Sequence, residues 1–201
     1  VLDMFDITPD YDLNIMKAGQ DLYDVTSNVL LGIKDVLIDF NPDVVLVHGD
    51  TITCFAAALS AFYLQIPVAH VKAGLHTGDM AAPFPEEANR SLVGRIAGYH
   101  FAPTEIAKNN LLAEGIDPEN IWVTGNTVID ALLEVQKKLP SYNTNDWSSK
   151  LPESLVEAIN NKPSYFILIT GHRRESFGEG FVNFCSALKT IAEKHPEWIL
   201  V

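Results

Sequence analysis

The feature that most constrains the fold is a regular alternation of short apolar runs with longer segments of helical spacing. Residues 44–47 form a continuous run, Val-Val-Leu-Val, which is typical of a strand covered on both faces of a parallel sheet. Residues 22–40 repeat apolar side chains at helical spacing and end just before Pro42. This alternation predicts an α/β fold with a parallel, Rossmann-like sheet and helices on both of its faces.

The remaining expected elements follow the same order along the chain. Further strands are expected at residues 68–71, 100–102, 121–123, 165–169 and 198–201. Further helices are expected at residues 55–64, 86–96, 105–114, 128–139, 155–159 and 181–194, and residues 1–5 have the apolar spacing of a helix tail. Thr104 is predicted to cap the helix that runs to Glu114, and Gly115 to close it.

A polar stretch at residues 141–150 interrupts the alternation. It is short of aliphatic side chains and is followed by Pro152. We therefore expect a first Rossmann-like domain over residues 1–150 and the start of a second over residues 151–201. Residues 1–5 have no helix start signal before them and the last predicted strand stops in mid-run, so we expect a fragment of a longer chain.

Composition argues against several classes of function. The 201 residues include 14 Lys and Arg against 26 Asp and Glu, for a net charge of −12. A chain this acidic offers no broad basic face to phosphates, so nucleic acid is not an expected partner. No apolar run approaches the ~20 residues that a membrane helix needs, so no membrane is expected either. Cys54 and Cys185 lie in apolar helical patterns and are expected to be buried free thiols of a reducing, cytoplasmic compartment.

Three short polar segments carry most of the chemical information. Residues 48–51 (His-Gly-Asp-Thr) and 170–175 (Thr-Gly-His-Arg-Arg-Glu) each follow a predicted strand, and residues 85–90 (Pro-Glu-Glu-Ala-Asn-Arg) open a predicted helix. In open parallel sheets, the residues just past the carboxyl ends of the strands line the ligand crevice. Arginine forks match the geometry of phosphate. The sequence therefore favours an enzyme site for an anionic, sugar- or nucleotide-like ligand.

Each of these candidates also has a structural explanation, and the sequence leaves both open. Asp50 would serve equally well as a helix N-cap. Glu86 and Glu87 would meet the positive end of a helix dipole, and Glu87 needs no other role. Arg90 lies four residues after Glu86, at the spacing of an ordinary ion pair. The segment from His172 to Glu175 would also fit a solvated, charged turn.

Other motifs narrow the range of chemistry. His48, His70 and His100 flank predicted strands and are expected to be structural. Residues 74–85 are rich in glycine, proline and small side chains, which predicts a mobile loop able to fold over a ligand. None of the six histidines has zinc-motif spacing, and the chain contains no Gly-x-Gly-x-x-Gly, phosphate-binding P-loop or Gly-x-Ser-x-Gly. A dinuclear metallophosphatase fails at its ligands, because Thr53 stands where it needs an acid.

Taken together, these segments resemble the non-hydrolysing bacterial UDP-N-acetylglucosamine 2-epimerases. The resemblance rests on long, irregular strings in the same order: DYDLNIM at 10–16, PDVVLVHGDT at 42–51, PEEANR at 85–90, VTGNTVIDAL at 123–132 and TGHRRESFG at 170–178. Such proteins have two Rossmann-like domains of the glycosyltransferase-B type, with the nucleotide sugar between them. The resemblance implies that this chain lacks the family's first strand and helix and most of its second domain.

The resemblance also implies a mechanism, the interconversion of UDP-N-acetylglucosamine and UDP-N-acetylmannosamine without a redox cofactor or a metal. The proton at sugar C2 is removed as UDP leaves C1, and UDP then adds back with a proton on the other face. The family's acids match Asp50 and Glu86, its active-site histidine matches His172, and its substrate-contacting arginine matches Arg90. We expect Arg173 to contact the UDP-sugar as well, and the protein to act as a homodimer that feeds surface polysaccharide synthesis.

The chain departs from the family at one string. The family's HVEAGLRT appears here as HVKAGLHT at residues 70–77, so Lys72 replaces a proposed catalytic glutamate and His76 replaces an arginine. Lys72 could pair with Asp50 or bind phosphate, but it cannot act as a carboxylate base. The sequence therefore supports two classes of function, a 2-epimerase or an impaired or non-catalytic nucleotide-sugar binder. A glycosyltransferase of the same architecture is a more distant third.

Overall fold

The computed structural model describes residues 2–139, 148, 151–161, 165–171 and 178–201. The chain divides into two compact units, Val1–Leu132 and Leu133–Val201, here called unit 1 and unit 2. The division falls inside helix α5 (Thr127–Lys138). The domain boundary predicted over residues 141–150 lies, except for Ser148, outside the described residues, so it stays a prediction.

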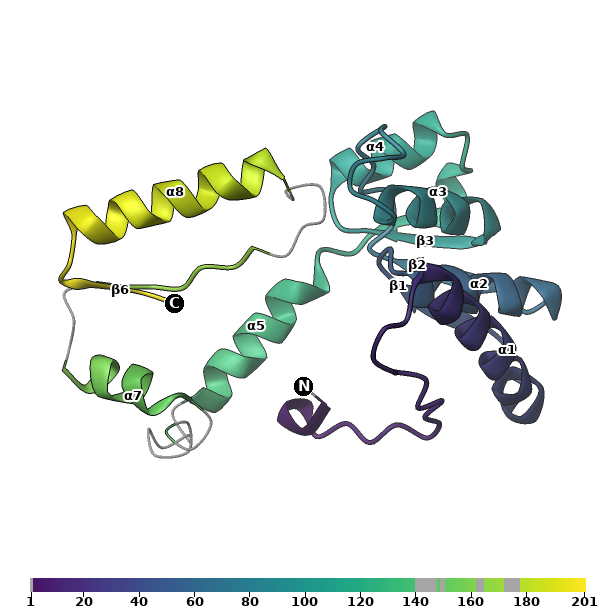
Figure 1. Cartoon of the computed structure of the whole chain (residues 1–201). Helices are drawn as coiled ribbons and strands as arrows, with labels where there is room; N and C mark the ends of the chain where they lie inside the picture. The colour runs from purple at the N-terminus through teal and green to yellow at the C-terminus, as the bar shows by residue number, and fades with distance from the viewer. Residues whose placement is uncertain (1, 140–147, 149–150, 162–164, 172–177) are drawn as a thin grey trace. The chain divides into compact units, whose positions relative to one another are not determined.

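Unit 1 is built on a parallel sheet of four strands in consecutive order (Figure 1). Its strands are β1 (Val45–His48), β2 (Val68–Val71), β3 (Tyr99–Ala102) and β4 (Ile121–Val123). The connecting helices are α2 (Ile52–Tyr63), α3 (Glu86–Ile96) and α4 (Glu105–Ala113), and α1 (Leu22–Phe40) precedes β1. Short 3₁₀ helices lie at Leu2–Phe5 and Pro118–Asn120. The α/β class and the parallel sheet predicted from the sequence are confirmed.

Local sequence signals set the ends of these helices. Asp21 caps α1 and forms a reciprocal capping box with Asp24, and the helix ends at Asn41 in a left-handed conformation. Thr104 accepts a hydrogen bond from the backbone N–H of Ala107, as expected for the cap of α4. The predicted bounds of α1, β2, α3 and β4 are those of the structure, and the other predicted α-helices and strands differ by one to three residues at an end.

Two apolar clusters hold unit 1 together. The larger joins α1, α2 and α3 to the first two strands, with Val47, Ala58 and Val93 among its buried members. The smaller joins α4 to β3 and β4, and Leu111 at its centre has 0% exposure. When consecutive parallel strands are joined by right-handed crossovers, the connecting helices all lie on one face of the sheet. The two clusters lie between that face and the helices.

The opposite face of this sheet does not follow the prediction. Leu46, Tyr99 and Trp122 point away from the buried clusters and are 64%, 42% and 42% exposed. The expectation of a β1 strand covered on both faces, and of helices on both faces of the sheet, is therefore wrong for the described part of unit 1. The physical reason is the strand order, because each crossover returns on the same side.

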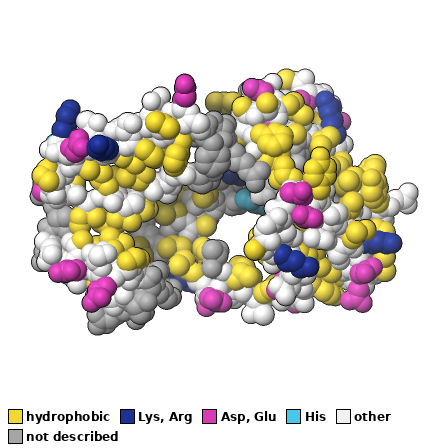
Figure 2. Space-filling view, viewed as in Figure 1, with side chains coloured by type: hydrophobic (Ala, Val, Ile, Leu, Met, Phe, Trp, Pro, Cys, Tyr) yellow, Lys and Arg dark blue, Asp and Glu magenta, His cyan; other side chains and the backbone are white. Residues whose placement is uncertain are grey.

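Unit 2 is smaller and more open. Its described elements are α7 (Glu153–Asn160), β5 (Tyr165–Ile167), α8 (Glu179–Lys194) and β6 (Trp198–Leu200), and the two strands pair in parallel. In Figure 2 hydrophobic side chains lie on the surface along α8 and over the strands beside it. Cys185 on α8 is exposed whereas Cys54 is buried, so the expectation of two buried thiols is wrong for Cys185. Two strands with the helices α7 and α8 leave much of the apolar surface of this unit open to solvent.

Among the helices that the structure describes, none is both long enough and apolar enough to cross a membrane.

Candidate functional site

The carboxyl edge of the unit 1 sheet gathers the first group of predicted site residues. Strands β1 and β2 pair in parallel, so the segments that follow them emerge at the same edge. Asp50 lies two residues after β1, and Lys72 directly follows β2. Arg90 from α3 reaches this edge, where its Nη2 lies 2.7 Å from Oδ2 of Asp50 in a charged hydrogen bond. Asn89 donates through Nδ2 to the backbone carbonyl of Asp50 at 2.9 Å.

These contacts exclude the helix N-cap as the explanation of Asp50. The N-cap of α2 is Thr51, whose hydroxyl accepts from the N–H of Cys54, so Asp50 is not needed for capping. Its carboxylate instead forms an ion pair with Arg90 and remains 27% exposed. An arginine that is only 8% exposed, paired with a carboxylate at the end of a strand, presents charge to the sheet edge where ligands bind in this class of fold.

Two buried side chains hold the backbone carbonyl of the residue just before Asp50. Gly49 adopts a positive φ of 76°, and its carbonyl accepts hydrogen bonds from Nε2 of His70 at 2.7 Å and from Sγ of Cys54 at 3.2 Å. Burial lowers the pKa of His70 to about 4, so the ring is neutral. Burial, with Asp50 nearby, raises the pKa of Cys54 to about 12. Both act as structural supports of the turn, which for His70 agrees with the sequence prediction.

Arg90 does not use the predicted partner. Its recorded ion pairs join it to Asp50 and to Glu87, whose Oε2 lies 3.4 Å from Nη1, and Nη1 also donates to the carbonyl of Leu75. The expected pair with Glu86, four residues earlier, is therefore replaced by one with Glu87, three residues earlier. Glu86 is the first residue of α3 and is half-buried. From their positions at a strand end and at a helix start, we predict that Asp50 and Glu86 lie on the same side of one cleft.

Glu87 is the residue that sequence reasoning missed. It is 2% exposed, and its carboxylate accepts hydrogen bonds from the backbone N–H groups of Thr77 and Gly78 and contacts Nδ1 of His76, each at 3.2 Å. Burial raises its pKa, but those two N–H groups and His76 outweigh burial, so the pKa lies below its ordinary value. Its spacing of three residues from Arg90 was the available sequence signal.

The loop between β2 and α3 is fixed at its start. Gly74 has a positive φ of 80°, and a Cβ there would collide with the backbone of Ala107 on α4. Its carbonyl accepts from Nδ2 of Asn110 at 2.9 Å, and the Thr77 hydroxyl donates to the carbonyl of Ala82 at 2.6 Å. The first five residues of the loop predicted to be mobile, residues 74–85, are thus bonded to α3 and α4, and the mobility itself stays a prediction.

Lys72 sits at a strained point of this edge. Its φ is +66°, a left-handed conformation that few side chains other than glycine and asparagine adopt readily. Strain of this kind persists where surrounding structure imposes it, and it is concentrated at functional sites. The residue is half-buried and directly follows β2, the strand that pairs with β1 next to Asp50.

The second group of predicted site residues follows β5. His172 and Arg173, with their neighbours Arg174 and Glu175, lie outside the described residues. Within the described part of the chain, no three His, Cys, Asp or Glu side chains are grouped as a metal site would require.

The two other strand histidines differ in setting. His48 is exposed at the end of β1, and its Nε2 lies 3.0 Å from the Thr127 hydroxyl at the start of α5. His100 is 1% exposed and lies beside His70, its register partner on the neighbouring strand. Burial lowers the pKa of His100. Of the two, the burial of His100 supports the structural role expected from the sequence.

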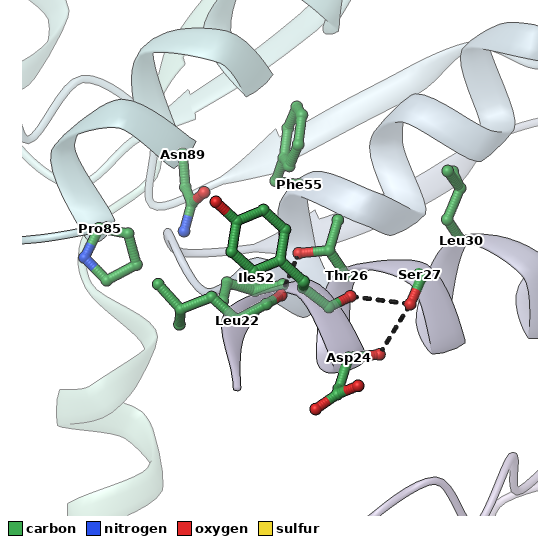
Figure 3. Close-up of a pocket in the computed structure, with 10 residues that line it drawn as sticks. Leu22, Asp24, Thr26, Ser27, Leu30, Ile52, Phe55, Pro85 and Asn89 are labelled. Carbon is green, nitrogen blue, oxygen red and sulfur yellow. Dashed lines mark hydrogen bonds between the residues drawn. The ribbon is translucent and has the colours of Figure 1, made fainter. Parts of the chain in front are cut away.

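A cavity of ≈ 640 Å³ adjoins the site behind Asn89 (Figure 3). Its walls come from α1 and from the first turns of α2 and α3, and they include Leu22, Leu30, Ile52, Phe55 and Pro85. The hydroxyls of Thr26 and Ser27 donate to carbonyls of their own helix. The charged groups thus lie at the sheet edge, and the cavity wall is largely apolar.

Comparison with known proteins identifies the family. The profile described as UDP-N-acetylglucosamine 2-epimerase matches residues 1–201. The UDP-N-acetylglucosamine 2-epimerase of Yersinia pestis is 55% identical over 197 residues, which are 98% of this chain and 51% of that protein.

Solved structures agree with this match. The UDP-GlcNAc 2-epimerase of Neisseria meningitidis bound to UDP-GlcNAc is 47% identical with a TM-score of 0.85, covering 99% of this chain and 52% of that one. The Methanocaldococcus jannaschii enzyme in complex with UDP-GlcNAc and UDP is 37% identical with a TM-score of 0.80, covering 100% of this chain and 53% of that one. The chain thus spans about half the length of these relatives, and it belongs to the UDP-N-acetylglucosamine 2-epimerase family.

Proposed function

We propose that the protein interconverts UDP-N-acetylglucosamine and UDP-N-acetylmannosamine by inversion at sugar C2. The observation that carries this proposal is the Asp50 carboxylate, which Arg90 holds at 2.7 Å on the carboxyl edge of a parallel sheet. Family membership supports the reaction, and the Neisseria relative, whose structure covers 99% of this chain, is bound to UDP-GlcNAc. We assign the same nucleotide sugar to this chain.

The reaction needs a base and an acid on opposite faces of the sugar ring. One group removes the C2 proton while the C1–O bond to UDP breaks, leaving a 2-acetamidoglucal and free UDP. UDP then adds back to C1, and C2 receives a proton on the other face. We assign the proton transfers to Asp50, Glu86 and His172, because carboxylates and imidazole are suited to general acid–base catalysis.

The diphosphate needs cations and N–H donors. We assign its binding to Arg90, Lys72 and Arg173, since guanidinium forks match phosphate oxygens and an ammonium group supplies a compact charge. Arg90 is poised for this role because Asp50 already fixes its fork, with 2.7 Å between Nη2 and the carboxylate. Charge stabilisation of departing UDP would lower the barrier to C1–O cleavage.

A second candidate function follows from Lys72. The family resemblance places a catalytic glutamate there, and the substitution changes the local charge by two units. A lysine that directly follows β2, where the family has a carboxylate, suits phosphate binding better than proton abstraction, because its ammonium group is a compact cation. On this alternative the protein is an impaired enzyme or a non-catalytic nucleotide-sugar binder.

Broader proposals rest on the same resemblance. We propose that the protein is a homodimer of the cytoplasm that feeds N-acetylmannosamine into surface polysaccharide, without a redox cofactor or a metal. We also propose a domain boundary near residue 150, with residues 151–201 opening a second Rossmann-like domain. Light scattering of the purified protein tests the dimer, and a monomer at micromolar concentration would contradict it.

The central experiment measures hydrogen exchange at C2. The protein, expressed from its complete reading frame, is incubated with UDP-N-acetylglucosamine in heavy water, and NMR follows deuterium at C2 and the appearance of the second epimer. Asp50→Asn should reduce the exchange rate by roughly 10²–10⁴, the usual contribution of a general acid or base. Asp43→Asn, at the opposite end of β1, is the matched control and should stay within twofold of the wild-type rate.

The Lys72 alternative has its own test in the same assay. On the impaired-enzyme reading, Lys72→Glu restores the family's carboxylate and raises the C2 exchange rate, and Asp50→Asn in that background lowers it again. UDP affinity in both variants shows whether binding has changed. A lower exchange rate in Lys72→Glu would contradict impairment and would assign Lys72 a catalytic role.

A further inference from the structure

The buried carboxylate of Glu87 joins three parts of unit 1. It faces the backbone N–H groups of Thr77 and Gly78, the ring of His76, and Nη1 of Arg90, at distances of 3.2 to 3.4 Å. At 2% exposure, a carboxylate is stable only when such donors replace its water. Glu87 therefore binds residues 76–78 of the β2–α3 loop to α3.

His76 extends the network to a third element. Its Nδ1 lies 3.2 Å from Oε1 of Glu87, and its Nε2 lies 3.1 Å from Oε1 of Glu114, the residue that ends α4. Each ring nitrogen of His76 thus faces one carboxylate. The ring, with side-chain exposure of only 9%, thereby joins the end of α4 to the beginning of α3.

The network ends at the Asp50 carboxylate. The guanidinium of Arg90 contacts Asp50 through Nη2 and both Glu87 and the Leu75 carbonyl through Nη1. Its Nε is buried and has no hydrogen-bond partner among the described residues, so the Nη groups alone fix the plane of the fork. Loss of Glu87 would remove one of the two anions that hold this plane and would release the loop carrying Leu75.

We propose that Glu87 is a positioning residue of the site: it sets the Arg90 fork on Asp50 and fixes the loop segment His76–Gly78 beside it. The proposal rests on the proposed function for its effect on turnover, although the geometric effect does not depend on turnover. Glu87 acts through Arg90 and touches no reacting atom. It thus differs from its neighbour Glu86, which we assign to proton transfer.

The first test is a kinetic cycle built on Glu87→Gln, which keeps the side-chain size and removes the charge. We expect the kcat for C2 inversion to fall roughly 10- to 100-fold, as small displacements of site groups do, with KM changed less than threefold. In an Arg90→Lys background, Glu87→Gln should change kcat less than twofold, because the guanidinium fork through which Glu87 acts on Asp50 is already absent. Equal effects in both backgrounds would overturn the proposal.

A matched control removes the trivial explanations. Glu105→Gln and Glu87→Gln each neutralise an acid in the first turn of a helix, α4 and α3 respectively. The two differ in that Glu105 is exposed and Glu87 is buried. It should leave kcat within twofold. A comparable loss in Glu105→Gln would mean that net charge or the helix dipole explains the effect, and would contradict a positioning role for Glu87.

The second test is independent of catalysis. Amide hydrogen exchange at Thr77 and Gly78 should be roughly 10- to 100-fold faster in Glu87→Gln, since each N–H loses a charged acceptor. The Arg90 side-chain NMR signals, assigned with Arg90→Lys, should show faster rotation of the guanidinium. If wild-type protein lacks C2 exchange, the proposed function fails while these signals still decide the role of Glu87. Unchanged signals would overturn it.

Should Glu87→Gln not fold, His76→Gln provides the same test in milder form. It removes the ring that links Glu87 to Glu114 and leaves the buried carboxylate in place. We expect the same signals to move in the same direction, by roughly three- to tenfold. No change in the Gly78 amide or the Arg90 guanidinium would contradict the network.

Discussion

Unit 1 and unit 2 are both built from parallel strands and helices, but they differ in how much they bury. In unit 1, Ala58, Val93 and Leu111 have 0% exposure, and even charged side chains such as Glu87 are almost fully covered. In the described part of unit 2 no residue is buried, and Phe166, Phe181 and Ile191 are at least a third exposed. The exposed hydrophobic side chains along α8 are visible in Figure 2.

The difference follows from the number of strands rather than from the type of sequence. Parallel strands are stable when helices cover them, and the two-stranded sheet of unit 2 with α7 and α8 buries no side chain among the described residues. In unit 1, four strands and the helices on them bury Glu87 and Arg90 to 2% and 8% exposure, so water should screen their ion pairs less than pairs on a surface. A polar network of this kind is therefore to be expected in unit 1 and not in the described part of unit 2.

The largest expected difference between the units is in thiol reactivity. Cys54 is buried with a pKa of about 12, so at neutral pH its thiolate fraction is ~10³ below that of an ordinary cysteine. Cys185 is exposed on α8. With a maleimide reagent, followed by mass spectrometry of the native protein, Cys185 should react at least ~10³ times faster. Similar rates at both positions would break the comparison. Cys185→Ser should abolish the fast phase.

The next largest difference between the units should be the loss of unfolding free energy when a leucine is truncated. Leu111→Ala removes a side chain of 0% exposure and should cost roughly 2–5 kcal/mol of unfolding free energy. Leu188→Ala makes the same chemical change on the half-exposed α8 and should cost about 1 kcal/mol or less. Native-state hydrogen exchange at β3 and α8 amides reports each unit separately. Equal costs would show that unit 2 has a tighter core than its exposure indicates.

Most of the fold was predictable from the sequence, because its signals are local. Apolar runs mark strands, helical spacing marks helices, and caps such as Asp21 and Thr104 act within four residues. What could not be predicted depends on contacts between distant segments. The exposure of Leu46 and of Cys185 depends on which face each crossover covers and on how many layers each unit has.

The candidate site divides in the same way. The strand-end positions of Asp50 and Lys72 and the place of Arg90 on α3 were predictable, since they follow from element order. The role of Glu87 was not, because its donors come from a loop about ten residues away whose path is set by Gly74 packing on α4. Spacing alone suggested Glu86 as the partner of Arg90, and packing selected Glu87.

A pH experiment tests how a buried histidine of unit 1 affects the unfolding free energy. The pKa of His70 is lowered by burial to about 4, so its neutral form stabilises the fold fully above the unfolded value near 6.5. That contribution is lost as the pH falls from about 6.5 towards 4, at up to about 1.4 kcal/mol per pH unit. His70→Gln keeps a donor for the Gly49 carbonyl and should flatten the slope.

The control for this experiment lies in unit 2. His195 is 42% exposed at the end of α8, so His195→Gln removes one imidazole from the chain without changing a buried side chain. Urea unfolding between pH 4.5 and 7.5 measures both variants against wild type. A slope that survives in His70→Gln would assign the acid sensitivity of unit 1 to other groups, with His100 next in line because burial also lowers its pKa.

The smallest expected effect concerns ion pairs. Lys189 and Glu193 lie 3.7 Å apart on α8 with side chains 77% and 65% exposed, so a double-mutant cycle to alanine should give a coupling of roughly 0.3–0.5 kcal/mol. The Asp50–Arg90 pair in unit 1 lies at 2.7 Å with the arginine side chain 10% exposed, and breaking it leaves a charge partly shielded from water. Its coupling, measured by the same cycle, should exceed about 1 kcal/mol and persist in 0.5 M salt, while that of Lys189–Glu193 should vanish. Equal couplings, equally weakened by salt, would mean that the Asp50 edge is as solvated as α8 and would remove the low-dielectric argument for the site.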